Sequence, residues 1–257
     1  MVHFVGAGSG AADLITVRGY RLLGEADVVI YAGSLVNPEL LHYTKKGCEI
    51  HNSAGMTLEQ VLAVVKSAEA AGKTTVRLHT GDSSLYGAVR EQFDQLEELG
   101  IDYDVCPGVS SFCGAAASLR AEYTLPEVSQ TVIITRAAGR TPVPERESVR
   151  SLAAHGATMV LFLSTSLADK LQDDLLAGGY APGTPAAVVY KATWPDEKIY
   201  RCTVETLAAT VAENGLTKTA LLIVGDCMGA DYARSKLYDP GFTTEFRRGT
   251  DAPAQGG

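Results

Sequence analysis

The hydrophobic positions in the first half of the chain follow two alternating patterns. Short runs of β-branched and apolar residues end at glycine or aspartate, and between them apolar residues recur at helical spacing. Thr57 and Gln60 have the spacing of a capping box before one such helix, and Gly72 ends it. We therefore expect strands over residues 3–5, 26–31, 74–78 and 103–106, and helices over residues 14–23, 58–71, 88–99 and 111–119.

The alternation pauses near residues 120–127 and then resumes. Strands and helices in alternation are typical of α/β proteins, so the chain is expected to form two α/β domains with mixed, mostly parallel sheets. The pause puts the boundary at about residue 122, between an N-terminal domain of residues 1–122 and a C-terminal domain of residues 123–257. The last residues, DAPAQGG, are expected to be disordered. The second half should contain strands over residues 131–135, 158–163, 186–190, 199–203 and 220–224, and helices over residues 166–177 and 204–214.

Two loops of the first half follow predicted strands, where open α/β sheets bind small ligands. In residues 74–87, TTVRLHTGDSSLYG, a buried strand breaks at Gly81 and Asp82. Residues 107–111, PGVSS, follow the next strand. Arg77 and His79 alternate along the first of these strands, so they share a face and are candidates to line the same site. Together the two loops predict one ligand site.

Composition narrows the class of ligand and the cellular location. A net charge of -8 and a pI near 5.2 argue against nucleic acid, because neutralising phosphates needs a basic face. The five cysteines are scattered without metal-ligand spacing, which predicts reduced thiols and no metal site. No secretory leader and no apolar run long enough to span a bilayer is recognisable. We therefore expect a cytoplasmic protein that binds neither nucleic acid nor membrane.

The glycine-rich turn after the first strand has two interpretations. Residues 6–11, GAGSGA, fit one form of the dinucleotide fingerprint, but that site also needs an acidic residue at the end of the second strand. Residues 31–33 are YAG there, which favours a tight turn that lines a pocket. Residues 72–74, GKT, look like part of a phosphate loop but lead into a strand, and are interpreted as a helix end.

Four segments carry a resemblance to a known family. Residues 4–10 (FVGAGSG), 14–19 (LITVRG), 81–87 (GDSSLYG) and 107–111 (PGVSS) resemble the tetrapyrrole methylases. That resemblance implies S-adenosylmethionine as cofactor, an active site in the cleft between two α/β domains, and a homodimer. In one place the chain departs from the family pattern, since residues 8–14 read GSGAADL where the family usually has GPGDPDL.

The second half resembles one branch of this family. Residues 135–145 (TRAAGRTPVPE), 190–197 (YKATWPDE) and 235–242 (SKLYDPGF) are similar to segments of the precorrin-4 C11-methyltransferases of cobalamin synthesis, in their free-ligand and cobalt forms. The implied reaction is an SN2 transfer of the sulfonium methyl to ring carbon C11, giving precorrin-5. The alternatives are another ring position, a methylase of modified histidine, or a non-catalytic tetrapyrrole-binding module.

The resemblance also implies site residues. Small residues let backbone groups approach a ligand, Asp82 can offset a cationic group, and leucines can pack on apolar parts. Arginine suits the carboxylates of a tetrapyrrole. No catalytic base can be chosen. The implied cofactor residues are Ser9, Thr80, Gly81, Asp82, Leu85, Ser110, Ser111, Leu163, Ala192 and Ala220, and the implied substrate residues are Arg136, Arg140 and Lys191.

Overall fold

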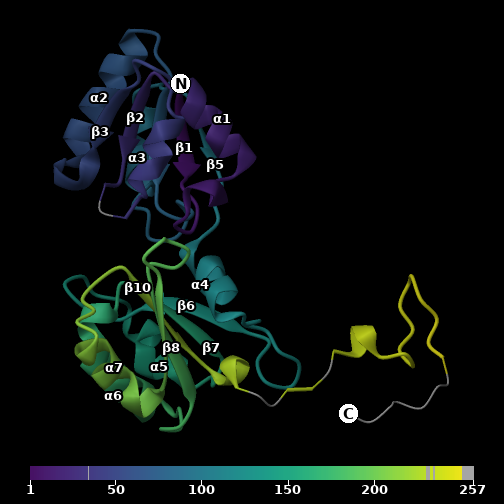
Figure 1. Ribbon diagram of the computed structural model, residues 1–257. Coiled ribbons are helices and arrows are strands. Elements are labelled where there is room, and N and C mark those ends of the chain that lie inside the picture. The colour runs from purple at the N-terminus through teal and green to yellow at the C-terminus, as the bar shows by residue number, and fades with distance from the viewer. Residues whose placement is uncertain (34, 230–231, 234, 251–257) are drawn as a thin grey trace. The chain divides into compact units, whose positions relative to one another are not determined.

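The structure of the protein is a computed structural model that describes residues 1–33, 35–229, 232–233 and 235–250. The chain divides into two compact units (Figure 1). The first contains Met1–Leu119 together with Val189–Ile199, and the second contains Arg120–Val188 together with Tyr200–Gly257. The sequence pattern did not predict that residues from the second half belong to the first unit. The expected disorder of residues 251–257 concerns residues outside the described part of the chain.

The first unit is built on a parallel sheet in the order β3-β2-β4-β1-β5. In the pairing of β1 with β4, Gly6 lies opposite His79, and in the pairing of β1 with β5, Val5 lies opposite Cys106. The carboxyl ends of β4, β1 and β5 therefore lie side by side at one edge of the sheet. The strands are β1 (Val2–Gly6), β2 (Val28–Tyr31), β3 (Glu49–Asn52), β4 (Thr75–His79) and β5 (Tyr103–Cys106).

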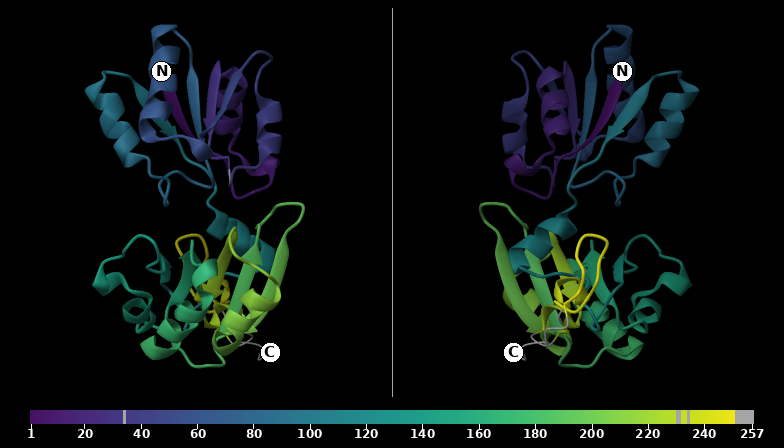
Figure 2. Two further views of the ribbon diagram at one scale, coloured as in Figure 1. Left: turned by 90° about the vertical axis from the view of Figure 1, so that its left-hand side faces the viewer. Right: turned by 90° about the vertical axis from the view of Figure 1, so that its right-hand side faces the viewer.

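Helices cover both faces of this sheet, as the two views in Figure 2 show. On one face Leu23 of α1 packs in a cluster with Val76 and Leu78 of β4. On the other face Phe4 packs in a cluster with residues of α2 and with Leu96 of α3. Alternation along β4 thus fills one face with aliphatic side chains and directs the polar residues between them to the other. The helices are α1 (Val17–Glu25), α2 (Leu58–Ala70), α3 (Arg90–Glu98) and α4 (Ser111–Leu119).

The second unit has a mixed sheet in the order β6-β7-β10-β8-β9. Strand β7 is parallel to β6 and antiparallel to β10. The strands are β6 (Val132–Arg136), β7 (Thr158–Phe162), β8 (Pro185–Tyr190), β9 (Lys198–Thr203) and β10 (Ala220–Val224), and the helices are α5 (Val149–Ala153), α6 (Ala168–Gly178) and α7 (Leu207–Glu213).

The predicted α/β class with parallel and mixed sheets is confirmed, and the clearest differences from the predicted elements concern α1, β3 and α5. Leu14 lies in a short 3-10 helix, and α1 begins only at Val17, because the hydroxyl of Thr16 accepts from the Gly19 amide at 3.1 Å and caps the helix there. Strand β3 and helix α5 were missed, since both are short and β3 is largely exposed, so neither has a clear hydrophobic period. No helix in the described ranges is long and apolar enough to cross a membrane.

Candidate functional site

The loops after β1 and β4 are joined through their backbones. The Ala7 amide donates to the His79 carbonyl at 2.7 Å, the Gly8 amide to the Gly81 carbonyl at 3.2 Å, and the Gly81 amide to the Gly8 carbonyl at 3.0 Å. Gly8 and Gly81 form an isolated antiparallel bridge. Beyond the parallel strands β1 and β4, the two loops therefore pair in the antiparallel direction. These hydrogen bonds fix the loop after β1 against the loop after β4.

The third loop, after β5, approaches so closely that side chains are excluded. A Cβ atom on Gly108 would lie 2.1 Å from the Gly81 carbonyl oxygen and 2.7 Å from the Gly6 Cα. Gly81 also has a φ of +62°, a left-handed conformation that favours glycine. The three strand ends thus pack backbone against backbone with no side chain between them, which fixes the position of the loops that follow.

Asp82 connects the second and third loops. Its Oδ2 accepts from the Gly108 amide at 2.8 Å, and its Oδ1 accepts from the Ser84 amide at 2.9 Å and from the Ser84 hydroxyl at 2.5 Å. Partial burial works to raise the pKa of Asp82, but these hydrogen bonds outweigh it and hold the pKa below its usual value. The carboxylate is therefore ionised at neutral pH, and it organises the loops as well as supplying negative charge.

The other predicted residues of these loops lie next to Asp82 or Gly81. The Leu85 amide donates to the Asp82 carbonyl at 3.3 Å. Ser110 is buried, its Cα is 3.4 Å from the position of a Cβ on Gly81, and Ser111 begins α4. The hydroxyl oxygen of Thr80 is buried and has no hydrogen-bond partner among the described residues. An unsatisfied buried hydroxyl at this place is available to a ligand.

Ser9 and Ala192 are brought together within the first unit by the segment Val189–Ile199. The Thr193 hydroxyl accepts from the Ala11 amide at 3.0 Å and lies 3.4 Å from the Ser9 hydroxyl. A Cβ on Gly10 would lie 2.3 Å from the Ala192 carbonyl oxygen. Sequence reasoning missed Thr193, because its only signal was a polar residue inside the 190–197 segment, far along the chain from the glycine turn.

Lys191 is engaged within its own segment. Its ammonium forms an ion pair with Asp196 at 2.5 Å and lies 5.2 Å from the centre of the Trp194 ring. The hydrogen bond to Asp196 raises the pKa of Lys191. The backbone of Lys191 is left-handed, with a φ of +47°, which is unusual for a residue with a side chain.

The remaining four predicted residues lie in the second unit. Leu163 has a left-handed φ of +53° and is 62% exposed, an unusual combination for an apolar residue, whereas Ala220 is buried and its carbonyl accepts from the Thr165 hydroxyl at 3.2 Å. Arg136 donates to the carbonyls of Thr141 at 3.2 Å and Pro142 at 2.8 Å, so its guanidinium holds its own loop. Arg140 is exposed and has no hydrogen bond or ion pair with the described residues.

That Arg77 and His79 line the ligand site stays a prediction: the His79 carbonyl accepts from the Ala7 amide at the strand end, and the His79 Nε2 is buried without a hydrogen-bond partner among the described residues. Both side chains are buried on the face of the sheet that carries Phe4 of β1, where the His79 ring stacks on Phe4 with centroids 6.0 Å apart. Burial lowers the pKa of Arg77 to about 10, and burial together with the charge of Arg77 lowers the pKa of His79 to about 3. At neutral pH Arg77 is therefore charged and His79 is neutral.

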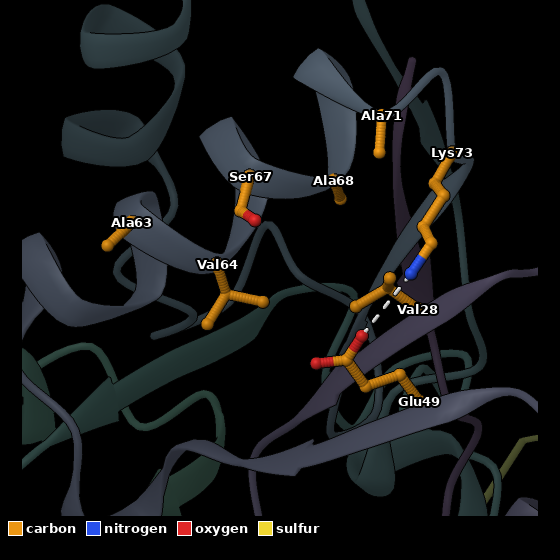
Figure 3. Close-up of a pocket in the computed structure, with 8 residues that line it drawn as sticks. All are labelled: Val28, Glu49, Ala63, Val64, Ser67, Ala68, Ala71 and Lys73. Carbon is orange, nitrogen blue, oxygen red and sulfur yellow. Dashed lines mark ion pairs between the residues drawn. The ribbon is translucent and has the colours of Figure 1, made fainter.

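A pocket elsewhere on the first unit is separate from the strand-end loops (Figure 3). It lies between α2 and the β2–β3 side of the sheet and contains none of the predicted site residues. Its Lys73 and Glu49 pair with each other at 3.5 Å. No group of three His, Cys, Asp or Glu residues that could hold a metal ion occurs in the described part of the chain. The other lining residues are Val28, Ala63, Val64, Ser67, Ala68 and Ala71.

Comparison with known proteins decides the family. The model of the tetrapyrrole (corrin/porphyrin) methylases matches residues 1–208. The chain belongs to this family. As a tetrapyrrole methylase, it is 55% identical over 248 residues to the cobalt-precorrin-4 C(11)-methyltransferase of Methanocaldococcus jannaschii, covering 96% of each chain. It is 44% identical to the precorrin-4 C(11)-methyltransferase of a Sinorhizobium species, covering 96% of this chain and 98% of the relative.

Solved structures of tetrapyrrole methylases have the same fold. A cobalt precorrin-4 methyltransferase superposes with a TM-score of 0.87 at 46% identity, covering 89% of this chain and 96% of the other. The uroporphyrin-III C-methyltransferase of Thermus thermophilus, solved in complex with S-adenosylhomocysteine, gives a TM-score of 0.74 at 26% identity, covering 89% and 93%. The family resemblance inferred from the sequence is thereby confirmed.

Proposed function

We propose that this tetrapyrrole methylase transfers a methyl group from S-adenosylmethionine to C11 of precorrin-4, in its metal-free or its cobalt form, during cobalamin biosynthesis. The observation that carries the proposal is the identity to C11-methyltransferases over nearly the whole of both chains. The joined loops after β1, β4 and β5 support it, because they are fixed against one another at the strand-end position where open α/β sheets bind small ligands.

One structural observation indicates that these loops can bind the cofactor. The Thr80 hydroxyl is buried without a partner beside Gly81, and a polar ligand at the strand ends can satisfy it. When bound, S-adenosylmethionine supplies an electrophilic methyl group on a cationic sulfonium. The residues proposed to hold it are Ser9, Thr80, Gly81, Asp82, Leu85, Ser110, Ser111, Leu163, Ala192 and Ala220.

The protein's part in the reaction is to position the cofactor. The loops around Gly81 and Gly108 are held by direct backbone contact, so the groups they present are preorganised. Asp82 keeps a negative charge at neutral pH, which favours a cationic ligand. Leu85 and Leu163 provide apolar contact. Transfer of a methyl cation to carbon needs no covalent enzyme intermediate, and we assign no catalytic acid or base.

Arg136, Arg140 and Lys191 are proposed to bind the carboxylates of the tetrapyrrole. Arg140 has all its donors available to the substrate, whereas Arg136 already donates to its own loop and Lys191 is paired with Asp196. Arg140 is therefore the cation whose removal should affect substrate binding most directly, whereas Arg136 and Lys191 would bind a carboxylate while also holding their own segments.

Replacing Arg140 by methionine is expected to raise the KM for the tetrapyrrole about three-fold, because one exposed charge-assisted hydrogen bond to a carboxylate is lost. Binding of S-adenosylhomocysteine, measured by calorimetry, should not change. Arg146→Met is the matched control, since Arg146 is an exposed arginine of the same unit. A KM for Arg140→Met equal to that of the control would rule out the assigned role.

The proposed reaction is tested by incubating the purified protein with S-adenosylmethionine and either metal-free or cobalt-loaded precorrin-4. Mass spectrometry should show the gain of one methyl group, and NMR should place it on C11. Faster turnover of one precursor identifies the metal state of the natural substrate. A methyl group on another carbon would contradict the regiospecificity, and failure to bind S-adenosylhomocysteine would indicate a non-catalytic tetrapyrrole-binding protein.

We also propose that the protein acts as a cytoplasmic homodimer. The dimer is an expectation from the family resemblance, and the five free cysteines support a reducing compartment. Sedimentation velocity should give twice the chain mass of 27.1 kDa. A sedimenting species with the mass of one chain at micromolar concentration would reject the dimer.

A further inference from the structure

Arg77 is a buried cation on the sheet of the first unit. It is 8% exposed, and no ion pair to it is found among the described residues. Its Nε donates to the side-chain oxygen of Gln92 on α3 at 3.2 Å, and its Nη1 donates to the Ile30 carbonyl at 3.1 Å. Burying a charge against neutral acceptors is costly, so these two hydrogen bonds are needed to hold Arg77 in place.

The contact with Arg77 fixes the orientation of the Gln92 amide. Arginine is only a donor, so the amide oxygen of Gln92 must face it and the amide nitrogen must point the other way. That nitrogen donates to the Ala88 carbonyl at 2.9 Å. Gln92 itself is 7% exposed. A chain of two hydrogen bonds therefore runs from β4, through α3, to the backbone at the end of the loop that follows β4.

This loop has an unusual backbone at the end that Gln92 contacts. Tyr86 has a φ of +55° and Ala88 a φ of +48°, and residues with side chains keep such left-handed conformations only where their surroundings fix them. Between them, Gly87 is so close to Ser83 that a Cβ would lie 2.2 Å from the Ser83 carbonyl oxygen. The beginning of the loop is held by Asp82, so Gln92 supplies a second attachment at its other end.

We propose that Arg77 and Gln92 are positioning residues that hold residues 82–88 in the shape that binds the cofactor. Arg77 orients the Gln92 amide, and Gln92 fixes the carbonyl of left-handed Ala88. The inference rests on the proposed function, because residues 82–88 contribute Asp82 and Leu85 to the cofactor site. Neither Arg77 nor Gln92 touches the ligand in this scheme.

The substitution Gln92→Glu separates positioning from packing. Glutamate keeps an oxygen acceptor for Arg77 and pairs with its charge, but it has no N–H to donate to Ala88. We expect an unchanged or raised Tm, a dissociation constant for S-adenosylhomocysteine raised about five-fold, and a KM for S-adenosylmethionine raised with little change in kcat. Hydrogen exchange of the amides of residues 83–88 should be faster even without ligand. A residue needed only for packing would lower the Tm instead.

The matched control is Gln95→Glu on the same helix, where the side-chain amide donates to Glu98 at the surface. The inference is overturned if Gln92→Glu matches this control in both ligand affinity and exchange of residues 83–88. If Gln92→Glu does not fold, Gln92→Met, which conserves the side-chain volume, takes its place with the same expected binding and exchange. If the unsubstituted protein does not bind S-adenosylhomocysteine, the proposed function fails, whereas exchange in the variants still tests the contact between Gln92 and the loop.

Discussion

Replacing Gly108 by alanine is expected to weaken binding of S-adenosylhomocysteine by about 100-fold or more. The new Cβ would lie 2.1 Å from the Gly81 carbonyl oxygen and 2.7 Å from the Gly6 Cα. Both neighbours are backbone atoms in hydrogen-bonded segments, so the clash must be relieved by separating the loops. Overpacking of this kind costs about 3 kcal/mol, and that energy corresponds to about two orders of magnitude in affinity.

The control for Gly108→Ala is Gly55→Ala, because a Cβ on Gly55 would meet no atom within 4 Å. Calorimetry gives the affinity of each variant, and circular dichroism confirms that each retains secondary structure. We expect Gly55→Ala to bind like the unsubstituted protein. Similar affinities for Gly108→Ala and Gly55→Ala would mean that the close approach of the three loops does not form the ligand site.

The strand-end loops could be predicted because their cause is local. The β-branched run of β4 ends at Gly81 and Asp82, and residues 107–111 follow another short strand. Parallel pairing then brings the carboxyl ends of β4, β1 and β5 to one edge, so sequence order and the rule for open α/β sheets were sufficient. The sequence pattern thus predicted where the ligand site lies and which loops form it.

The contacts between distant segments could not be predicted in the same way. The hydrogen bond from the Ala11 amide to the Thr193 hydroxyl forms because residues Val189–Ile199 belong to the first unit. The hydrophobic periodicity of the sequence does not predict this association. Arginine suits carboxylates, so Arg136 is predicted to bind the substrate; the pattern does not predict that its donors also reach the carbonyls of Thr141 and Pro142. The sequence shows that a charged side chain is present. Which groups it hydrogen-bonds to is determined by the conformation of the folded loop.

Arg77 shows that the sequence pattern does not predict which face of a strand a polar residue lies on. Its alternation with His79 correctly indicated that the two share a face of β4, but the pattern did not say which face. Val76 and Leu78 pack with α1, so the polar pair lies on the side of Phe4 and α3. When helices cover both faces of a sheet, both faces are buried. The sequence therefore does not indicate on which of the two faces a buried arginine lies.

Replacing Asp82 by asparagine is expected to weaken binding of S-adenosylhomocysteine about ten-fold. Both carboxylate oxygens accept hydrogen bonds, from Ser84 and from the Gly108 amide. In asparagine one of these positions becomes an NH2 group that faces another donor, so at least one contact is lost and the loops separate. Asp94→Asn is the control, since Asp94 forms a surface ion pair with Arg90 along α3.

The same substitution has a pH signature in stability. Because the folded-state pKa of Asp82 is lowered, the unfolded state binds its proton more readily, and the stabilisation from the ionised carboxylate is fully present above the unfolded pKa of about 4. It is lost as pH falls through the lower folded-state pKa. Urea unfolding should therefore show a constant difference between the unsubstituted protein and Asp82→Asn from about pH 7 to 5, shrinking below about pH 4. A difference that stays constant down to pH 3 would mean that the charge of Asp82 does not hold the loops together.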